Sequence, residues 1–219
     1  MRELAPSLWQ LGGFPPNSFN VYLIGDVLID AATRWGGGRI LRQLGDRKLS
    51  MLALTHAHPD HQGCARMICE RYAIPLACHA RDVATMEGER PMQPDHLFMR
   101  SFSPLWAGQA FPVTRILQEG EEVGGFRVIH APGHTPGHVI LFREGDRVAV
   151  IGDLMSSMNL ALTWRGLREP PALFCTDQQE NRRSIRRLAE LEPRLLCFGH
   201  GPPLSDMKKF DRFLKRLSA

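Results

Sequence analysis

The residues with the clearest chemical potential lie in one short segment, Thr55 to His61. Three imidazoles and one carboxylate fall within six residues there, at His56, His58, Asp60 and His61. Imidazole nitrogens and carboxylate oxygens are the donors that zinc and its neighbours accept, at about 2.0–2.2 Å. Residues two apart can project to the same side, whereas the adjacent Asp60 and His61 must diverge. The spacing therefore predicts two metal ions, with a solvated polar loop as the alternative.

Three more candidate ligands stand at the ends of apolar runs further along the chain. His134 follows Ala131-Pro132-Gly133, Asp153 follows Val150-Ile151-Gly152, and His200 follows Cys197-Phe198-Gly199. A glycine beside each ligand lets the backbone turn sharply, so that the side chain can point back over the edge of a sheet. Each motif is weak when taken singly, but together they supply enough donors for a binuclear site.

The pattern of apolar runs and turn residues predicts alternating strands and helices around these ligands. A Thr176-x-x-Gln179 capping box should begin the helix that ends at 191. Residues 83–112 have no clean period and are interpreted as a partly helical insert. We expect strands at 19–24, 27–30, 49–54, 75–78, 126–129, 139–143, 147–152 and 195–198, and helices at 38–44, 61–72, 177–191 and 206–217.

Composition places the chain among ordinary globular proteins. The 219 residues with 43% hydrophobic content fit one domain over residues 1–219. The formal charge of +4, from 27 basic and 23 acidic side chains, predicts neither a nucleic-acid nor a membrane partner. Five cysteines without a Cys-x-x-Cys spacing suit reduced thiols, and no export signal stands at the amino terminus. We expect a cytoplasmic protein and leave its oligomeric state open.

The four motifs, in this order, resemble the metallo-β-lactamase superfamily, whose signature is His-x-His-x-Asp-His, then Gly-His-Thr-x-Gly, then Asp, then His. The resemblance implies an α/β (α+β) fold, a four-layer αβ/βα sandwich of two mixed β-sheets flanked by helices. It also implies that Asp153 bridges two ions together with a water or hydroxide. The other ligands divide into two sets: His56, His58 and His134 for the first ion, and Asp60, His61 and His200 for the second.

Asp30, at the end of its strand, matches an aspartate that members of this family often place just behind the metals. A hydrogen bond from a ligand to such a group fixes the orientation of an imidazole. A polar strand terminus without any role is the alternative. His130 and His138 flank the His134 loop, and we expect them on the adjoining strands as supporting or core groups.

The resemblance implies a metal-dependent hydrolase that cleaves an ester, thioester or lactone carbonyl of a small molecule. The ions are expected to be zinc, with iron or manganese as alternatives, and Asp60 is the hypothetical donor of a proton to the leaving group. Glyoxalase II-type thioesterases share every ligand, although their glutathione site lies largely after the last histidine, where only residues 201–219 follow here. A persulfide dioxygenase with one iron and β-lactamase-like amide hydrolysis remain alternatives.

The segment after Asp153 and the insert are the expected walls of a substrate pocket. Their side chains are mostly apolar, which favours a substrate with an acyl or aromatic portion. Simple packing of the loop is an equally good interpretation. The predicted pocket residues are Met155, Met158, Leu160, Trp164 and Phe174.

Overall fold

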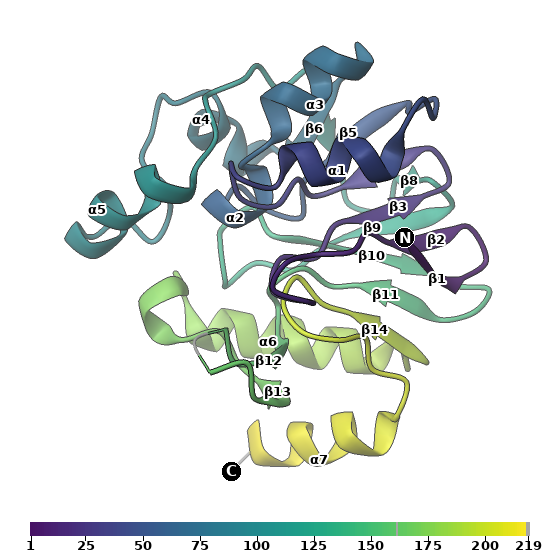
Figure 1. Ribbon diagram of the computed structural model, residues 1–219. Coiled ribbons are helices and arrows are strands. Elements are labelled where there is room, and N and C mark those ends of the chain that lie inside the picture. Colours follow the sequence, from purple (N-terminus) through teal and green to yellow (C-terminus); the bar gives the residue numbers. More distant parts are fainter. Residues whose placement is uncertain (161, 218–219) are drawn as a thin grey trace.

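Two β-sheets face each other in the computed structural model, which describes residues 1–160 and 162–217 (Figure 1). Helices cover the outer face of each sheet. The architecture confirms the predicted α/β sandwich of two mixed sheets flanked by helices.

The first sheet has seven strands in sequence order. Its first four strands pair antiparallel, and β4 to β7 pair parallel. Parallel pairing sends the carboxyl ends of β4, β5 and β6 to one edge, where the loops that follow them meet. The strands are β1 (Arg2–Ala5), β2 (Leu8–Gln10), β3 (Tyr22–Ile24), β4 (Val27–Ile29), β5 (Met51–Ala53), β6 (Leu76–His79) and β7 (Arg115–Leu117).

The second sheet has five strands in the order β14-β11-β10-β9-β8, with β11 and β14 parallel and the other pairs antiparallel. A separate antiparallel ribbon of β12 and β13 lies outside it. The strands are β8 (Glu122–Val123), β9 (Phe126–His130), β10 (Val139–Arg143), β11 (Val148–Val150), β12 (Ser156–Met158), β13 (Arg165–Arg168) and β14 (Leu195–Cys197).

The helices follow the same division between the two halves. Of these helices, α1 and α3 pack on the first sheet, α6 and α7 pack on the second, and α4 and α5 belong to the predicted insert. The helices are α1 (Gly37–Leu44), α2 (Pro59–Gln62), α3 (Ala65–Tyr72), α4 (Val83–Met86), α5 (Leu97–Trp106), α6 (Gln178–Glu190) and α7 (Met207–Leu217), with short 3₁₀ turns η1 (Ala80–Asp82) and η2 (Ala172–Phe174).

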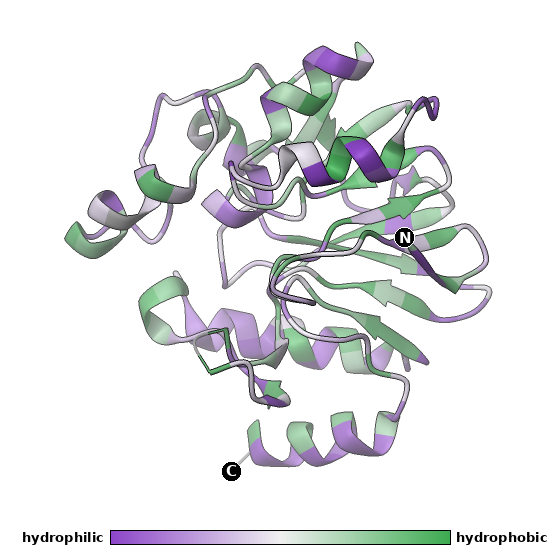
Figure 2. Ribbon diagram, in the orientation of Figure 1, coloured by the Kyte–Doolittle hydropathy of each residue, from purple (hydrophilic) through white to green (hydrophobic). Residues whose placement is uncertain are grey.

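Alternation along the strands divides the core into layers. In β3 and β4, Leu23 and Leu28 face α1 and α3, while Tyr22 and Ile29 face the second sheet. Figure 2 shows the strands as mainly apolar and the covering helices as mixed in character. Because both faces of each sheet are covered, apolar residues dominate the strands, and the polar ligands are left for the loops at the strand ends.

Three expectations from the sequence differ from the structure. The helix expected at 61–72 is two helices, because the backbone leaves the helical region at Cys64, with φ of −108° and ψ of 11°. The preceding Gly63 packs closely on the chain at Arg34, where an added Cβ would lie 2.3 Å from Arg34 N. The cap of α6 is Asp177, which accepts from Glu180 N–H, so the Thr176 capping box was wrong by one residue. Sequence reasoning also missed the short strands β1, β2, β7, β8, β12 and β13.

Within the described part of the chain, none of the helices combines the length and apolar character needed to cross a bilayer.

Candidate metal centre

The predicted ligands lie on four segments that follow the ends of strands, and Asp60 and His61 of the first segment fall in the short helix α2. His56 follows β5, His134 lies between β9 and β10, Asp153 follows β11, and His200 follows β14. Backbone hydrogen bonds join these loops directly, including Val139 N–H to Thr55 O at 2.8 Å and Gly199 N–H to Gly152 O at 2.7 Å. The seven predicted ligand side chains are therefore brought together at one edge of the sandwich.

His56, His58 and His134 form the first group of donors. Their ligand atoms lie within 4.8 Å of one another, and His134 Nε2 is 2.9 Å from His58 Nδ1. All three side chains are buried. Three convergent imidazoles match the donor set of a tetrahedral zinc site that keeps one position open.

Asp60, His61 and His200 form the second group, also within 4.8 Å. His200 Nε2 lies 3.2 Å from Asp60 Oδ2. Asp153 stands between the two groups: its Oδ2 is 2.9 Å from His200 Nε2 and 3.7 Å from His134 Nε2, and its Oδ1 is 3.3 Å from His61 Nε2. A carboxylate in this position can contact two neighbouring ions at once.

The outer nitrogens of four ligand histidines are held by oxygen acceptors. His58 Nε2 is 2.6 Å from the Gln93 carbonyl, His61 Nδ1 is 2.8 Å from Asp30 Oδ2, and His200 Nδ1 contacts the Ser18 carbonyl. His56 Nδ1 lies 3.1 Å from Thr55 Oγ1. In the neutral form of each ring, an oxygen acceptor places the imidazole proton on the outer nitrogen, which leaves the lone pair of the inner nitrogen for a cation.

Asp30 organises this arrangement from behind. Its carboxylate accepts from Thr55 N–H at 2.8 Å, from the Thr55 hydroxyl and from His61, and its side chain is buried. Its backbone lies in the left-handed region, with φ of 63°, a conformation that aspartate tolerates better than most residues. The contact expected from the resemblance is present, and the Thr55 contact is an addition that the sequence did not reveal.

The pKa values of the histidines differ between the two groups. Burial, followed by the neighbouring imidazoles, lowers the pKa of His56 and His134 well below the ordinary value, which favours their neutral, ligating form. Burial opposes charge at His200 too, but Asp153 and then Asp60 raise its pKa to about 10. Burial acts against the ionised form of Asp153, yet His200 and His61 hold its pKa well below its usual range.

Several buried polar atoms of the centre have no hydrogen-bond partner among the described residues. They include His56 Nε2, His61 Nε2 and Asp153 Oδ1, three atoms that face one another. A buried polar atom without a partner costs roughly 1–3 kcal/mol. Imidazole and carboxylate donors that converge in this way fit divalent cations, and coordination would satisfy all three atoms.

Close packing explains two of the glycines beside the ligands. A Cβ on Gly199 would lie 2.1 Å from Asp153 Oδ1, and Gly152 has φ of 47°, with His138 Nε2 at 2.8 Å from its Cβ position. His138 itself accepts from Asp153 N–H at 3.1 Å, and burial lowers its pKa to about 3. His138 therefore supports the centre as a neutral acceptor behind Asp153.

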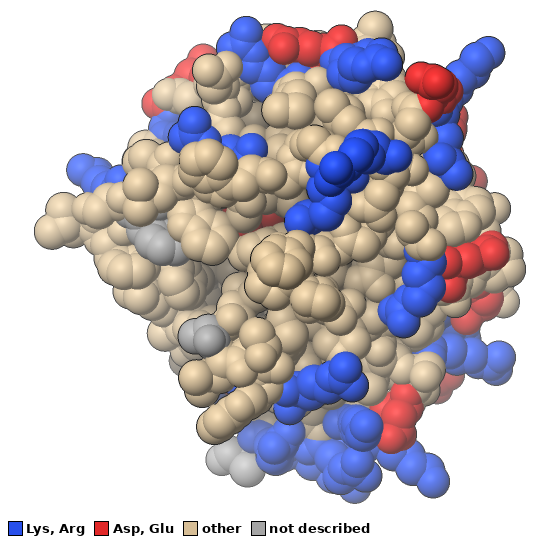
Figure 3. Space-filling view, viewed as in Figure 1, with Lys and Arg blue, Asp and Glu red and all other residues tan. Residues whose placement is uncertain are grey.

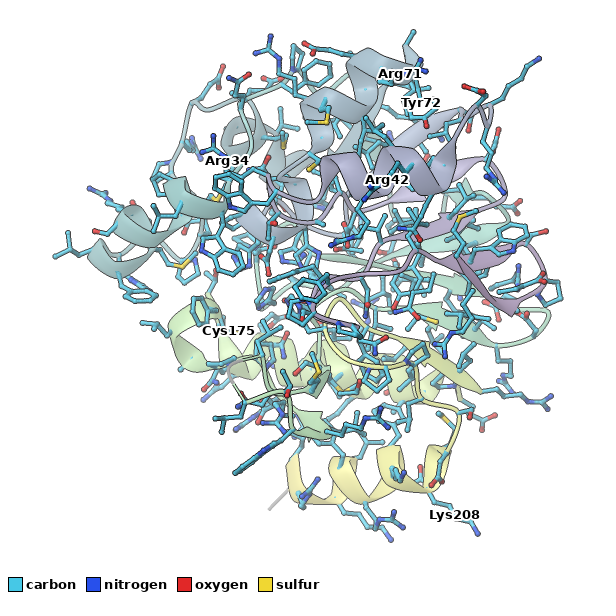
Figure 4. The ribbon with its side chains drawn as sticks, in the orientation of Figure 1. Arg34, Arg42, Arg71, Tyr72, Cys175 and Lys208 are labelled. Atoms are coloured by element: carbon cyan, nitrogen blue, oxygen red, sulfur yellow. The ribbon has the colours of Figure 1, made fainter. Side chains whose placement is uncertain are left out.

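Two segments rise beside the centre, and we name them the insert arm (residues 91–106) and the ribbon arm (residues 156–160 and 162–174). Each is anchored at a ligand: the Gln93 carbonyl contacts His58, and Ser157 N–H donates to the His200 carbonyl at 3.0 Å. The arms meet where Phe98 and Phe174 lie 6.0 Å apart between ring centroids. In Figure 4, Cys175 lies where the ribbon arm leads into α6, and its thiol donates to the Gly133 carbonyl beside His134.

The predicted pocket residues divide between these arms and the core. Leu160 is 41% and Trp164 69% exposed on the ribbon arm, and Phe174 is half-buried at its end. Met155 is fully buried in the core layer against α6 and α7, so packing accounts for that residue. Met158 is also buried. Large apolar side chains are instead exposed on the insert arm, where sequence reasoning named no individual pocket residue: Leu97, Phe98 and Leu105.

Comparison with known proteins agrees with this geometry. The sequence profile of the metallo-β-lactamase superfamily matches residues 15–200. The chain belongs to this superfamily. It is 32% identical to the probable metallo-hydrolase YflN of Bacillus subtilis, over 82% of this chain and 76% of that protein. It is 30% identical to a hydroxyacylglutathione hydrolase of Acidiphilium cryptum, over 74% of this chain and 54% of the longer relative.

Solved structures of the superfamily superpose over nearly the whole chain. TTHA1623, solved in a di-iron-bound form, has 28% identity and a TM-score of 0.63, with 92% of each chain covered. The B3 metallo-β-lactamase BLEG-1 has a TM-score of 0.72 over 94% of this chain and 99% of that one, at 23% identity, and shares the fold. The membership and the His and Asp clusters together make this superfamily chain a metal-dependent hydrolase.

Proposed function

We propose that this protein hydrolyses an ester, thioester or lactone carbonyl of a small molecule with two divalent ions, zinc in the first place. The observation that carries the proposal is the state of the histidines. Four outer nitrogens are engaged by oxygen acceptors, and the inner nitrogens converge on Asp153 and on one another. Side chains arranged only for packing would have no reason to direct these inner nitrogens at one another.

A pair of divalent ions in this position supplies Lewis acidity for the carbonyl oxygen and lowers the pKa of water toward neutrality. His56, His58 and His134 would hold the first ion, and Asp60, His61 and His200 the second. Asp153 would contact both. The chain's own contribution is to fix these donors from behind, through Asp30, Thr55 and the carbonyls of Ser18 and Gln93.

Asp60 is the residue that we propose moves the proton. Its side chain is 19% exposed, compared with 12% for Asp153 and 6% for His200, so among these three it is the most open to a bound substrate. A carboxylate oxygen of Asp60 would take the proton that the water loses as it attacks the carbonyl carbon, and would pass it to the leaving group as the bond to that carbon breaks. Its other oxygen would stay directed at the second ion.

The substrate class follows from the arms and from the relatives. Large apolar side chains are exposed on both arms, and charged side chains are sparse on the part of the surface where α5 projects, while Lys and Arg gather toward α7 (Figure 3). Hydroxyacylglutathione hydrolases, whose name specifies an acylated glutathione as the substrate, are among the relatives. We therefore propose a substrate with an apolar acyl or aromatic part next to an ester, thioester or lactone carbonyl.

A panel of thioesters, lactones, aryl esters and β-lactams, assayed on zinc-, manganese- and iron-loaded protein, tests the proposal. We expect turnover of thioesters or esters with two ions bound per chain and a loss of at least about a hundredfold in chelator, restored by zinc. Oxygen uptake by the iron-loaded protein with a persulfide, without hydrolysis in any metal form, would overturn the proposal. Preferential turnover of β-lactams would show that the substrate is an amide of this kind and not an ester, thioester or lactone.

A further inference from the structure

Asp82, at the end of η1, is a buried carboxylate that the proposed chemistry does not use. Only 4% of its surface is exposed. A carboxylate removed from water must be compensated by hydrogen bonds or charge. The contacts of Asp82 show where that compensation comes from.

Two backbone amides from separate loops donate to the Asp82 carboxylate. Ala57 N–H donates to Oδ2 at 2.9 Å, and Gly137 N–H donates to the same group. The fit at Gly137 is tight, because an added Cβ would lie 2.3 Å from Asp82 Oδ1. The carboxylate therefore joins a point on each loop, and a side chain larger than that of glycine does not fit at position 137.

The two amides belong to the two loops that carry the first group of ligands. Ala57 stands between His56 and His58, and Gly137 lies three residues after His134. One carboxylate thus spans the loops of all three donors. By contrast, His61 and His200, in the second group, are held by Asp30 and the Ser18 carbonyl.

We propose that Asp82 is a positioning residue for the first metal ion, an inference that rests on the proposed two-ion centre. By tying the His56 loop to the His134 loop, it holds three imidazoles at the separation that a tetrahedral ion requires. An ionised carboxylate does this well because hydrogen bonds from amide N–H groups to a charged oxygen are roughly twice as strong as neutral ones. Removal of the Asp82 carboxylate should weaken binding of the first ion more than binding of the second.

The test measures metal binding in Asp82→Asn, whose amide keeps the shape but offers one acceptor oxygen to two N–H donors. Gly137→Ala perturbs the same contact from the other loop, and exposed Asp46→Asn is the matched control. Stepwise titration with Zn²⁺ and Co²⁺ would give both affinities. Two reference variants identify the ions by their Co²⁺ absorption spectra. His134→Asn gives the spectrum expected when the first site is lost, and His200→Asn gives the spectrum expected when the second site is lost.

We expect the first ion to bind about 10–100-fold more weakly in Asp82→Asn and Gly137→Ala. The affinity for the second ion should change by less than about threefold. The Co²⁺ spectrum should match that of His134→Asn, and the melting temperature of metal-free protein should fall by only a few degrees. Unchanged first-ion affinity, or equal weakening of both ions, would overturn the role of Asp82. If the wild-type chain does not bind two metal ions, the proposed function is wrong, and this inference fails with it.

Discussion

The metal ligands with Asp30 and Thr55 behind them, which we call the floor of the site, differ from the two arms in how deeply their side chains are buried. Ligands of the floor such as His56 and His61 are at most 1% exposed and stand at the ends of buried strands. On the arms, Leu97 is 81%, Leu162 54% and Trp164 69% exposed. A floor held this rigidly specifies one chemistry, whereas arms with few packing constraints can change to suit different substrates.

Substitutions in the two regions should therefore have different costs. A change in the floor leaves buried donors unpaired or misplaced, and its effect should appear in turnover and metal binding. A change on the arms removes apolar contact with substrate, and its effect should appear in KM. The following predictions test this division, beginning with the largest effect.

Asp60→Asn should lower kcat by about 10²–10⁴-fold, because an amide cannot pass a proton to the leaving group. The amide oxygen can still act as a ligand, so both ions should remain bound at the higher metal concentrations of the assay. Metal analysis of the assayed sample, together with kcat for substrates with good and poor leaving groups, would check this. The loss should be larger for poor leaving groups, which need the proton.

A loss of the second ion in Asp60→Asn would assign Asp60 to coordination alone. A uniform loss across all leaving groups with both ions present would also contradict the proton role. Either result leaves the metal-dependent reaction in place and removes only the function proposed for this side chain. The outcome therefore separates the two roles of one floor residue.

Trp164→Ala should raise KM for substrates with a long apolar acyl part by about 5–30-fold, because it removes apolar contact area. Values of kcat and bound metal should stay near those of the wild type. Kinetics on an acyl series from acetyl to decanoyl would show an effect that grows with chain length. Met67→Ala on α3, another exposed apolar position, is the matched control.

An equal effect of Trp164→Ala on acetyl and decanoyl substrates would mean that the ribbon arm shapes the floor. Such a result would contradict the prediction that changes on the arms act on KM alone. A loss of bound metal in the variant would point to the same conclusion, through the contact between Ser157 and His200.

The floor could be predicted from sequence because its donors are dense and their spacing is local. All four ligands between His56 and His61 alternate or adjoin within one short segment, and His134, Asp153 and His200 each follow an apolar run with a glycine. Two-residue periodicity and strand-end glycines are local signals. The long apolar strands were predicted from signals of the same kind, and the structure has β3, β4, β9 and β10 within a few residues of the expected places.

Contacts between distant segments could not be predicted in this way. Asp82 is separated by 25 residues from Ala57, and the Ser18 carbonyl by 182 from His200. No periodicity marks a backbone carbonyl as the partner of one imidazole. Short edge strands such as β8 and β13 were missed for a related reason: the tertiary fold, more than local preference, makes them pair.

The smallest expected effect concerns a histidine at the junction of the two sheets. His79 ends β6, is 9% exposed, and its Nε2 lies 3.3 Å from Nδ1 of His130 at the end of β9. Arg81 N–H donates to His79 Nδ1 at 3.1 Å. The two contacts place the only proton of the neutral ring on Nε2, directed at His130, so a second proton would break the contact with Arg81.

Burial, followed by the nearby His130 and Arg81, lowers the pKa of His79 to about 4 from an ordinary value of 6.5. The unfolded chain therefore binds this proton more readily, so stability from His79 is fully present above pH 6.5 and is lost as pH falls toward 4. His79→Asn keeps an acceptor for Arg81 but does not titrate. Between pH 8 and pH 4.5, metal-free wild type should lose roughly 1–2 kcal/mol more unfolding free energy than the variant. Urea unfolding at both pH values measures this, and identical losses would show that water already solvates the junction in the folded protein.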